Sequence, residues 1–371
     1  MTQIAEKVEL VDDLKELSPE EQLEQENFEK ELEIRKKLLN KYVFSENTLM
    51  ILDVAYSMNK NVILYGPGGH GKSELTEDFF REKGIEPFVL TMGKGMTVDK
   101  LLGGVDIPKF MEEGKQEYLV ENSFMAHEYV IFEELLDCPD YILEQLKDIL
   151  SSGKFRNGSQ VYEIKTKMIV GNTNRTRDEY AKNDTSIRAL LERFPLSLEV
   201  KWANYTNETY NKLFECRYGR TNYLLVEIIK DFNADKNSKA PISPRIALTA
   251  FDMIETCGED CLKFIAEFSN NPALLQSSIS NAKAAVEFHK YVHDLEEILT
   301  HTENNFKRLS SSSTLEELTK VTKDLTECTN LLKKFNSYKV PDSYTNEKAK
   351  VTDYANKKLL ELKKLIESFT C

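Results

Sequence analysis

The stretch GPGGHGKS, residues 66–73, decides the fold of this 371-residue chain. It fits the pattern G-x-x-x-x-G-K-[ST], the apolar run NVILY precedes it, and ELTEDFFREKG continues it as a helix. In such a loop the glycines let backbone N–H groups surround phosphate oxygens, while the lysine and the hydroxyl after it bind phosphate and Mg²⁺. The sequence therefore predicts a nucleotide phosphate loop between a strand and a helix. Its expected binding residues are Gly66, Pro67, Gly68, Gly69, His70, Gly71, Lys72 and Ser73, and Ser73 is also a predicted metal ligand.

Two consecutive acids follow a second apolar run, YVIF at residues 129–132. A site that hydrolyses nucleotide needs one acid near the metal and a base for the attacking water. Successive side chains of a strand point to opposite faces, so only the end of a strand lets two neighbouring acids serve one site. We therefore predict that Glu133 and Glu134 lie at this site, where acids are needed near the metal and near the attacking water.

Short apolar runs bounded by turn residues alternate with helical stretches between residues 61 and 200. This alternation is typical of an α/β domain with a largely parallel sheet. Two glycine-containing stretches, residues 103–119 and 153–165, are predicted to form inserted β-hairpins. The expected strands are NVILY (61–65), PFVLT (87–91), YVIF (129–132), KMIV (167–170) and LSLEV (196–200).

The order of these motifs resembles that of the MoxR-like AAA+ ATPases over roughly residues 42–280. Lys72 and Ser73 match the Walker A lysine and hydroxyl. The stretch FMAHEYVIFEELLDCPDYILEQLKDIL resembles the MoxR Walker B region, in which the acid pair is normally Asp-Glu. The resemblance implies that Glu133 stands at the aspartate position and that Glu134 is the catalytic glutamate.

The segment KMIVGNTNR, residues 167–175, resembles the sensor 1 strand of this family. The resemblance implies that Asn174 is the polar residue that orients the attacking water. Asn172 is the alternative if the register is shifted by two residues.

Two later segments resemble the arginine-bearing motifs of the family. SIRALLERF (186–194) is similar to the segment that carries the arginine finger, which implies that role for Arg193, with Arg188 as the alternative. SPRIAL (243–248) is very similar to the start of the sensor 2 helix, which implies that Arg245 is the sensor arginine.

Residues 1–40 and 284–371 lie outside the resemblance, and the division of the chain follows from the sequence pattern as well. We expect an acidic helical segment at 1–41, an α/β nucleotide-binding domain at 42–202, an α-helical lid at 203–283 and a helical C-terminal domain at 284–371. In the last region, apolar residues recur at three- and four-residue spacing from Leu318 to Phe335, which favours a helical bundle or a coiled coil.

Members of the MoxR-like group use ATP with Mg²⁺ and typically assemble as homo-hexamers, in which the arginine finger of one subunit reaches the nucleotide of the next. The resemblance implies an ATP hydrolase that remodels or matures a protein complex, with a von Willebrand factor A (vWA) domain protein or a metal-dependent enzyme as its partner. Charge supplied by a neighbouring subunit would make hydrolysis depend on assembly.

Two other functions stay open. GNTNR faintly resembles the Asn-Thr-x-Asp motif of McrB-like GTPases, which would indicate a GTPase or a nucleic-acid motor subunit, but Arg175 stands at the aspartate position. If Glu133 cannot position the metal, the chain is a nucleotide-binding scaffold with little hydrolysis.

Composition and charge narrow the choice of partner and compartment. The net charge of −13 argues against a broad cationic surface, so a nucleic-acid partner is not expected. No apolar stretch approaches the roughly 20 residues that span a bilayer. The acidic N-terminal residues contain no basic leader, and the six cysteines are scattered, so we expect a cytoplasmic protein with no membrane segment.

Overall fold

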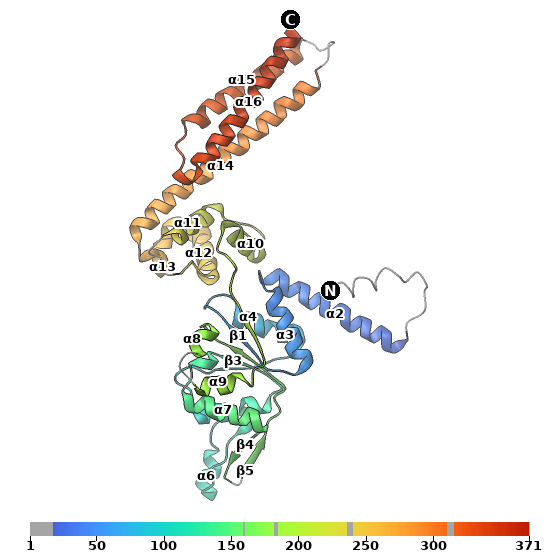
Figure 1. Ribbon diagram of the computed structural model, residues 1–371, viewed down its shortest axis with the longest axis vertical. Helices are drawn as coiled ribbons and strands as arrows, with labels where there is room; N and C mark the ends of the chain where they lie inside the picture. Colours follow the sequence, from blue (N-terminus) through green and yellow to red (C-terminus); the bar gives the residue numbers. More distant parts are fainter. Residues whose placement is uncertain (1–17, 159, 182–184, 236–239, 310–314, 371) are drawn as a thin grey trace. The chain divides into compact units, whose positions relative to one another are not determined.

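The structure is a computed structural model that divides into two compact units between Ala203 and Asn204 (Figure 1). It describes residues 18–158, 160–181, 185–235, 240–309 and 315–370.

Within these residues, the first unit is built on a five-stranded sheet in the order β2-β3-β6-β1-β7. All neighbouring strands are parallel, which confirms the predicted α/β sheet. Each strand begins and ends within two residues of the bounds predicted from an apolar run in the sequence. The strands are β1 (Val62–Tyr65), β2 (Phe88–Thr91), β3 (Tyr129–Glu133), β6 (Met168–Asn172) and β7 (Leu196–Glu199).

Helices cover both faces of the sheet, and β1 shows how the sequence requires this. Its alternate residues Val62 and Leu64 join a core with one set of helices, whereas Ile63 and Tyr65 join the core on the other face. Burying each such side chain contributes about 1.5–3 kcal/mol. The first face is covered by α2 (Pro19–Lys41), α3 (Glu46–Met58) and α4 (Lys72–Glu82), and the second by α5 (Val98–Leu102), α7 (Asp140–Ser152) and α9 (Thr185–Leu191).

One of the two predicted hairpins is present. β4 (Lys154–Asn157) and β5 (Gln160–Glu163) pair antiparallel, which confirms the hairpin expected at residues 153–165. The hairpin expected at 103–119 is wrong, because this stretch folds as α6 (Ile107–Glu113), closed by an isolated bridge between Val105 and Tyr118.

Helix signals outweigh the strand pattern in this insert. The Asp106 side chain accepts a 3.0 Å hydrogen bond from the Lys109 N–H, proline stands in the first turn, and Gly114 ends the helix with φ of 67°. The two inserts lie side by side (Figure 1), because the rings of Tyr118 and Phe155 pack edge to face at 5.6 Å. The remaining short elements of this unit are η1 (Val120–Asn122), η2 (Phe124–Ala126), η3 (Leu135–Asp137) and α8 (Arg177–Ala181).

The second unit is helical throughout its described residues, as the sequence predicts. Its first part contains α10 (Asn207–Tyr218), α11 (Tyr223–Ala234), α12 (Pro244–Cys257), η4 (Glu259–Phe264) and α13 (Ala266–Ser269). Its second part contains α14 (Pro272–Lys307), α15 (Leu315–Ser337), η5 (Asp342–Tyr344) and α16 (Thr345–Thr370).

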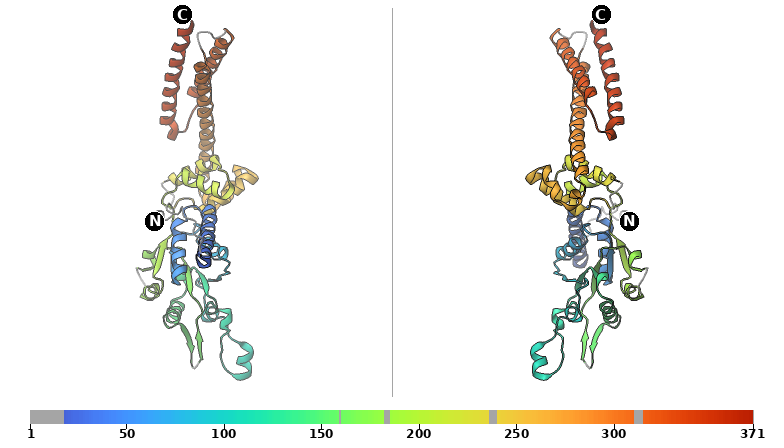
Figure 2. Two further views of the ribbon diagram at one scale, coloured as in Figure 1. Left: turned by 90° about the vertical axis from the view of Figure 1, so that its right-hand side faces the viewer. Right: turned by 90° about the vertical axis from the view of Figure 1, so that its left-hand side faces the viewer.

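Three long helices, α14, α15 and α16, lie against one another as a bundle (Figure 2). The stripe predicted from spacing contributes to its core, because Val321, Leu325, Cys328, Leu332 and Phe335 are all buried, whereas Leu318, its first residue, is only partly buried. Helix α14 runs unbroken across the boundary proposed between residues 283 and 284, so one helix belongs to both parts of this unit. Among the described residues, no helix is long and apolar enough to cross a membrane.

Candidate nucleotide-binding site

The loop between β1 and α4 has the backbone of a phosphate cradle. Gly66, Gly69 and Gly71 take positive φ angles of 133°, 79° and 78°, which side-chain-bearing residues rarely adopt. At Gly66 a Cβ atom would come within 2.2 Å of the Val200 carbonyl oxygen, so no other residue fits. Such left-handed turns make concave backbone sites that suit anions.

Lys72 is held inside this loop, with 5% of its surface exposed. Its Nζ donates hydrogen bonds of 2.8 Å to the Gly66 carbonyl and 2.9 Å to the Pro67 carbonyl. The ammonium therefore lies across the loop, beside the backbone that is expected to surround phosphate.

The ends of three elements meet beside the loop. Ser73 Oγ, at the start of α4, donates a 2.6 Å hydrogen bond to Glu133 Oε2 at the end of β3. Asn172 Nδ2, at the end of β6, donates a 2.7 Å bond to Glu133 Oε1. A hydroxyl and a carboxylate are the oxygen donors that Mg²⁺ prefers, so the two predicted metal ligands fit this ion.

Asn172 is the asparagine nearest to these groups. It is 1% exposed, and its Nδ2 also donates to Thr76 Oγ1 at 3.2 Å. Its Oδ1 is buried without a hydrogen-bond partner among the described residues, a state that usually marks the place of a water or a ligand. Asn174 lies two residues beyond β6 and is exposed, so the structure brings Asn172, and not Asn174, into contact with Glu133.

Glu134 has an unusual backbone, with φ of 55° and ψ of 33°. This left-handed conformation stores strain in a non-glycine residue, as is common at functional sites. Its carboxylate lies over Gly93, just after β2, because a Cβ atom on Gly93 would come within 2.9 Å of Glu134 Oε2. Gly93 was not among the predicted site residues, and the only signal for it in the sequence is a glycine soon after a predicted strand.

A second set of contacts braces the loop that carries Asn174. The Thr173 hydroxyl bonds to Tyr180 OH, which donates a 3.2 Å bond to Asp137 Oδ2, and Arg175 lies 3.8 Å from the same carboxylate. Burial raises the pKa of Tyr180 to about 12, so the phenol stays protonated. These contacts join η3, which follows Glu134, to the predicted sensor loop, and no sequence motif indicated them.

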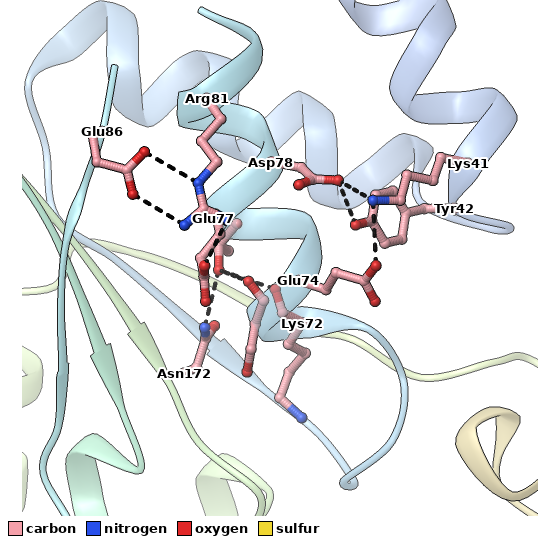
Figure 3. A network of polar contacts seen from close by, with 11 residues as sticks. Lys41, Tyr42, Lys72, Glu74, Glu77, Asp78, Arg81, Glu86 and Asn172 are labelled. Carbon is pink, nitrogen blue, oxygen red and sulfur yellow. Dashed lines mark hydrogen bonds and ion pairs between the residues drawn. The ribbon is translucent and has the colours of Figure 1, made fainter. Parts of the chain in front are cut away.

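Aromatic side chains flank the phosphate loop. The Trp202 ring lies 5.9 Å from His70 and 5.8 Å from Phe44, both edge to face. Burial lowers the pKa of the His70 imidazole, which therefore carries little charge at neutral pH. Tyr42 OH donates a 2.8 Å hydrogen bond to Asp78 on α4 and so fastens the end of α2 beside the loop (Figure 3).

Of the predicted arginines, Arg193 lies away from this cluster. Arg193 stands before the amino end of β7, whereas the phosphate loop follows the carboxyl end of its parallel neighbour β1. Four residues of strand, roughly 13 Å, separate the two edges. Arg188 is exposed on α9, and Arg245 is exposed in the first turn of α12, in the second unit.

The strand order, the phosphate loop after β1, the paired acids after β3 and the polar residue at the end of β6 together define a P-loop ATPase of the AAA+ class. Within that class, the family described as the MoxR domain in the MoxR-vWA-beta-propeller ternary systems matches residues 29–221. The chain belongs to this MoxR family.

Two solved structures are similar in part. NtrX from Brucella abortus is 15% identical, with a TM-score of 0.40, over 64% of this chain and 56% of that chain. The RuvB Holliday junction branch migration motor of Thermotoga maritima is 16% identical, with a TM-score of 0.38, over 67% of this chain and 68% of that chain. The family assignment rests on the MoxR match alone.

Proposed function

We propose that this protein is a cytoplasmic, ring-forming AAA+ ATPase that hydrolyses ATP with Mg²⁺ and uses the energy to remodel or mature a protein complex. The contact between Ser73 Oγ and Glu133 Oε2 at 2.6 Å carries this proposal. It brings a hydroxyl and a carboxylate together beside Lys72, with Glu134 as the next residue.

Each residue has a distinct task in this proposal. Lys72 and the loop N–H groups bind the phosphates, while Ser73 and Glu133 hold Mg²⁺. When bound there, Mg²⁺ offsets charge on the phosphate oxygens. Glu134 accepts the proton of the attacking water, and an asparagine, Asn174 or Asn172, orients that water.

The position of Arg193 in the sheet supports assembly into a ring. We propose that this ring is a homo-hexamer. This side chain lies at the edge of the sheet opposite to its own phosphate loop, so it suits a neighbour's nucleotide better than its own. Arg245 is proposed to act as the sensor arginine of the lid.

The family description supports a vWA-domain protein as the partner. A net charge of −13 supports a protein client over nucleic acid.

Steady-state phosphate release from wild type, Lys72→Ala and Glu134→Gln tests the proposal, with ring size measured by light scattering. We expect ATP turnover in the assembled wild type and a loss of at least about 100-fold in both variants. Equal rates in all three proteins would refute the site. Nucleotide binding without turnover would indicate a scaffold, and a preference for GTP with DNA stimulation would indicate the McrB-like alternative.

A further inference from the structure

Asn61, the residue before β1, uses both ends of its side-chain amide. Its Nδ2 donates a 3.0 Å hydrogen bond to the Arg193 carbonyl, and its Oδ1 accepts a 2.9 Å bond from the Ile169 N–H. The two partners are far from it in sequence and lie on different elements. One half-buried side chain therefore joins β1 to β6 and to the turn that carries Arg193.

The Arg193 side chain, unlike its carbonyl, makes its hydrogen bonds to residues outside the sheet. Its Nε donates to Ser151 Oγ at 2.9 Å, and its NH1 lies 2.8 Å from Glu192 Oε2 and 3.3 Å from the Ala189 carbonyl. Glu192 is exposed, so this ion pair is screened by water and contributes little. The guanidinium can therefore leave these partners for a neighbouring subunit while the backbone bond to Asn61 is kept.

A cavity adjoins one side of this turn, although Phe194, the next residue, is buried in the core. A cavity of about 330 Å³ opens beside Asn61 and Arg193, and Lys60 and Pro195 also line it. The hydrogen bond from Asn61 ties the Arg193 carbonyl to the sheet, and the Arg193 N–H bonds within its own turn to the Leu190 carbonyl at 2.8 Å.

We propose that Asn61 is a positioning residue for the arginine finger. It holds the Arg193 backbone where the guanidinium can reach the nucleotide of the next subunit. Since β1 leads directly into the phosphate loop, the same strand then supports a subunit's own nucleotide at one end and, at the other end, the finger that this subunit offers to its neighbour. This inference rests on the proposed ring-forming function.

The variant Asn61→Ala tests the proposal by steady-state hydrolysis. We expect kcat to fall roughly 10- to 100-fold, less than for full loss of a finger, with the KM for ATP unchanged. Lys60→Ala, which alters the same cavity, is the matched control and should keep the wild-type kcat.

Mixed rings separate positioning of the finger from a general structural role. A Glu134→Gln subunit lacks its base but offers an intact Arg193 to its neighbour. Mixing it with Asn61→Ala should therefore restore activity above that of either variant alone, as mixing it with Arg193→Ala should. A mixture of Asn61→Ala with Arg193→Ala should show no recovery, because both supply a defective finger.

A second variant covers the case in which Asn61→Ala does not fold. Asn61→Asp keeps the acceptor for the Ile169 N–H and loses the donor to the Arg193 carbonyl. The carboxylate oxygen that replaces Nδ2 faces the Arg193 carbonyl oxygen and repels it, so we expect a lower thermal midpoint than in wild type. The folded protein should show the same loss of kcat and the same recovery in mixed rings.

Three outcomes would overturn the proposal. The first is a wild-type kcat in folded Asn61→Asp, and the second is an equal loss of kcat in Lys60→Ala. The third is that rings mixed from Asn61→Ala and Glu134→Gln show no recovery of activity, although rings mixed from Arg193→Ala and Glu134→Gln do recover. If Arg193→Ala itself keeps the wild-type rate, the proposed function in trans fails, and the role of Asn61 fails with it.

Discussion

Ser73 Oγ and Glu133 Oε2 lie 2.6 Å apart, so the hydroxyl that follows the phosphate-loop lysine is bonded directly to the acid at the end of β3. The other oxygen of the same carboxylate accepts a bond from Asn172 at 2.7 Å. Where the family usually has aspartate, the longer glutamate spans the gap between α4 and β6. Each carboxylate oxygen of Glu133 therefore accepts a hydrogen bond from a different element.

Glu133→Asp is expected to weaken the site. The substitution withdraws the carboxylate by about 1.5 Å, one C–C bond, so it cannot keep both contacts. We expect the Mg²⁺ concentration needed for half-maximal hydrolysis to rise roughly 10- to 100-fold. Phosphate release titrated with Mg²⁺ measures this, and a faster enzyme at every Mg²⁺ concentration would mean that the glutamate slows the reaction.

Trp202 should report nucleotide binding, because it is the single tryptophan and its ring lies 5.9 Å from His70 in the phosphate loop. We expect ATP to change its fluorescence in wild type and in Glu134→Gln. In Lys72→Ala the affinity should fall about 10- to 100-fold, because a charged hydrogen-bond donor is lost. Trp202→Phe should remove the signal. An unchanged titration in Lys72→Ala would place the nucleotide elsewhere.

Gly93→Ala is expected to impair the base without affecting nucleotide binding. A Cβ atom there would lie 2.9 Å from Glu134 Oε2 and push the carboxylate aside. We expect kcat to fall about tenfold or more, since small displacements of catalytic groups are costly, while the KM stays unchanged. At Gly95 a Cβ atom meets nothing within 4 Å, so Gly95→Ala is the control. Wild-type kinetics in Gly93→Ala would show that the Glu134 carboxylate works from another position.

The two asparagines near β6 should respond differently to alanine. Asn172 is buried and bonded to Glu133, so Asn172→Ala should lower both the free energy of unfolding, by about 1–3 kcal/mol, and kcat. Asn174 is exposed, so Asn174→Ala should leave the unfolding free energy within about 0.5 kcal/mol of wild type. Chemical denaturation and phosphate release measure the two effects. Loss of kcat in Asn174→Ala alone would assign water orientation to Asn174.

The features of the fold that could be predicted are those that depend on local sequence patterns. The strands, the phosphate loop and the stripe from Val321 to Phe335 all depend on residues close together in sequence, and each has the predicted element. The stretch 103–119 was mistaken because its glycines indicate turns equally well around a hairpin and around a short helix. In the structure Asp106 caps the start and Gly114 the end of a helix in this stretch.

By itself the sequence determined the class of fold and the chemistry of the phosphate loop, because spacing and side-chain type act locally. Only the tertiary structure decided which distant groups meet. Asn172 contacts Glu133 because β6 lies beside β3 in the sheet, and Asn61 holds the Arg193 carbonyl across 132 positions of sequence. Strand order and register create such contacts, and no short motif encodes them because each partner is contributed by a different part of the chain.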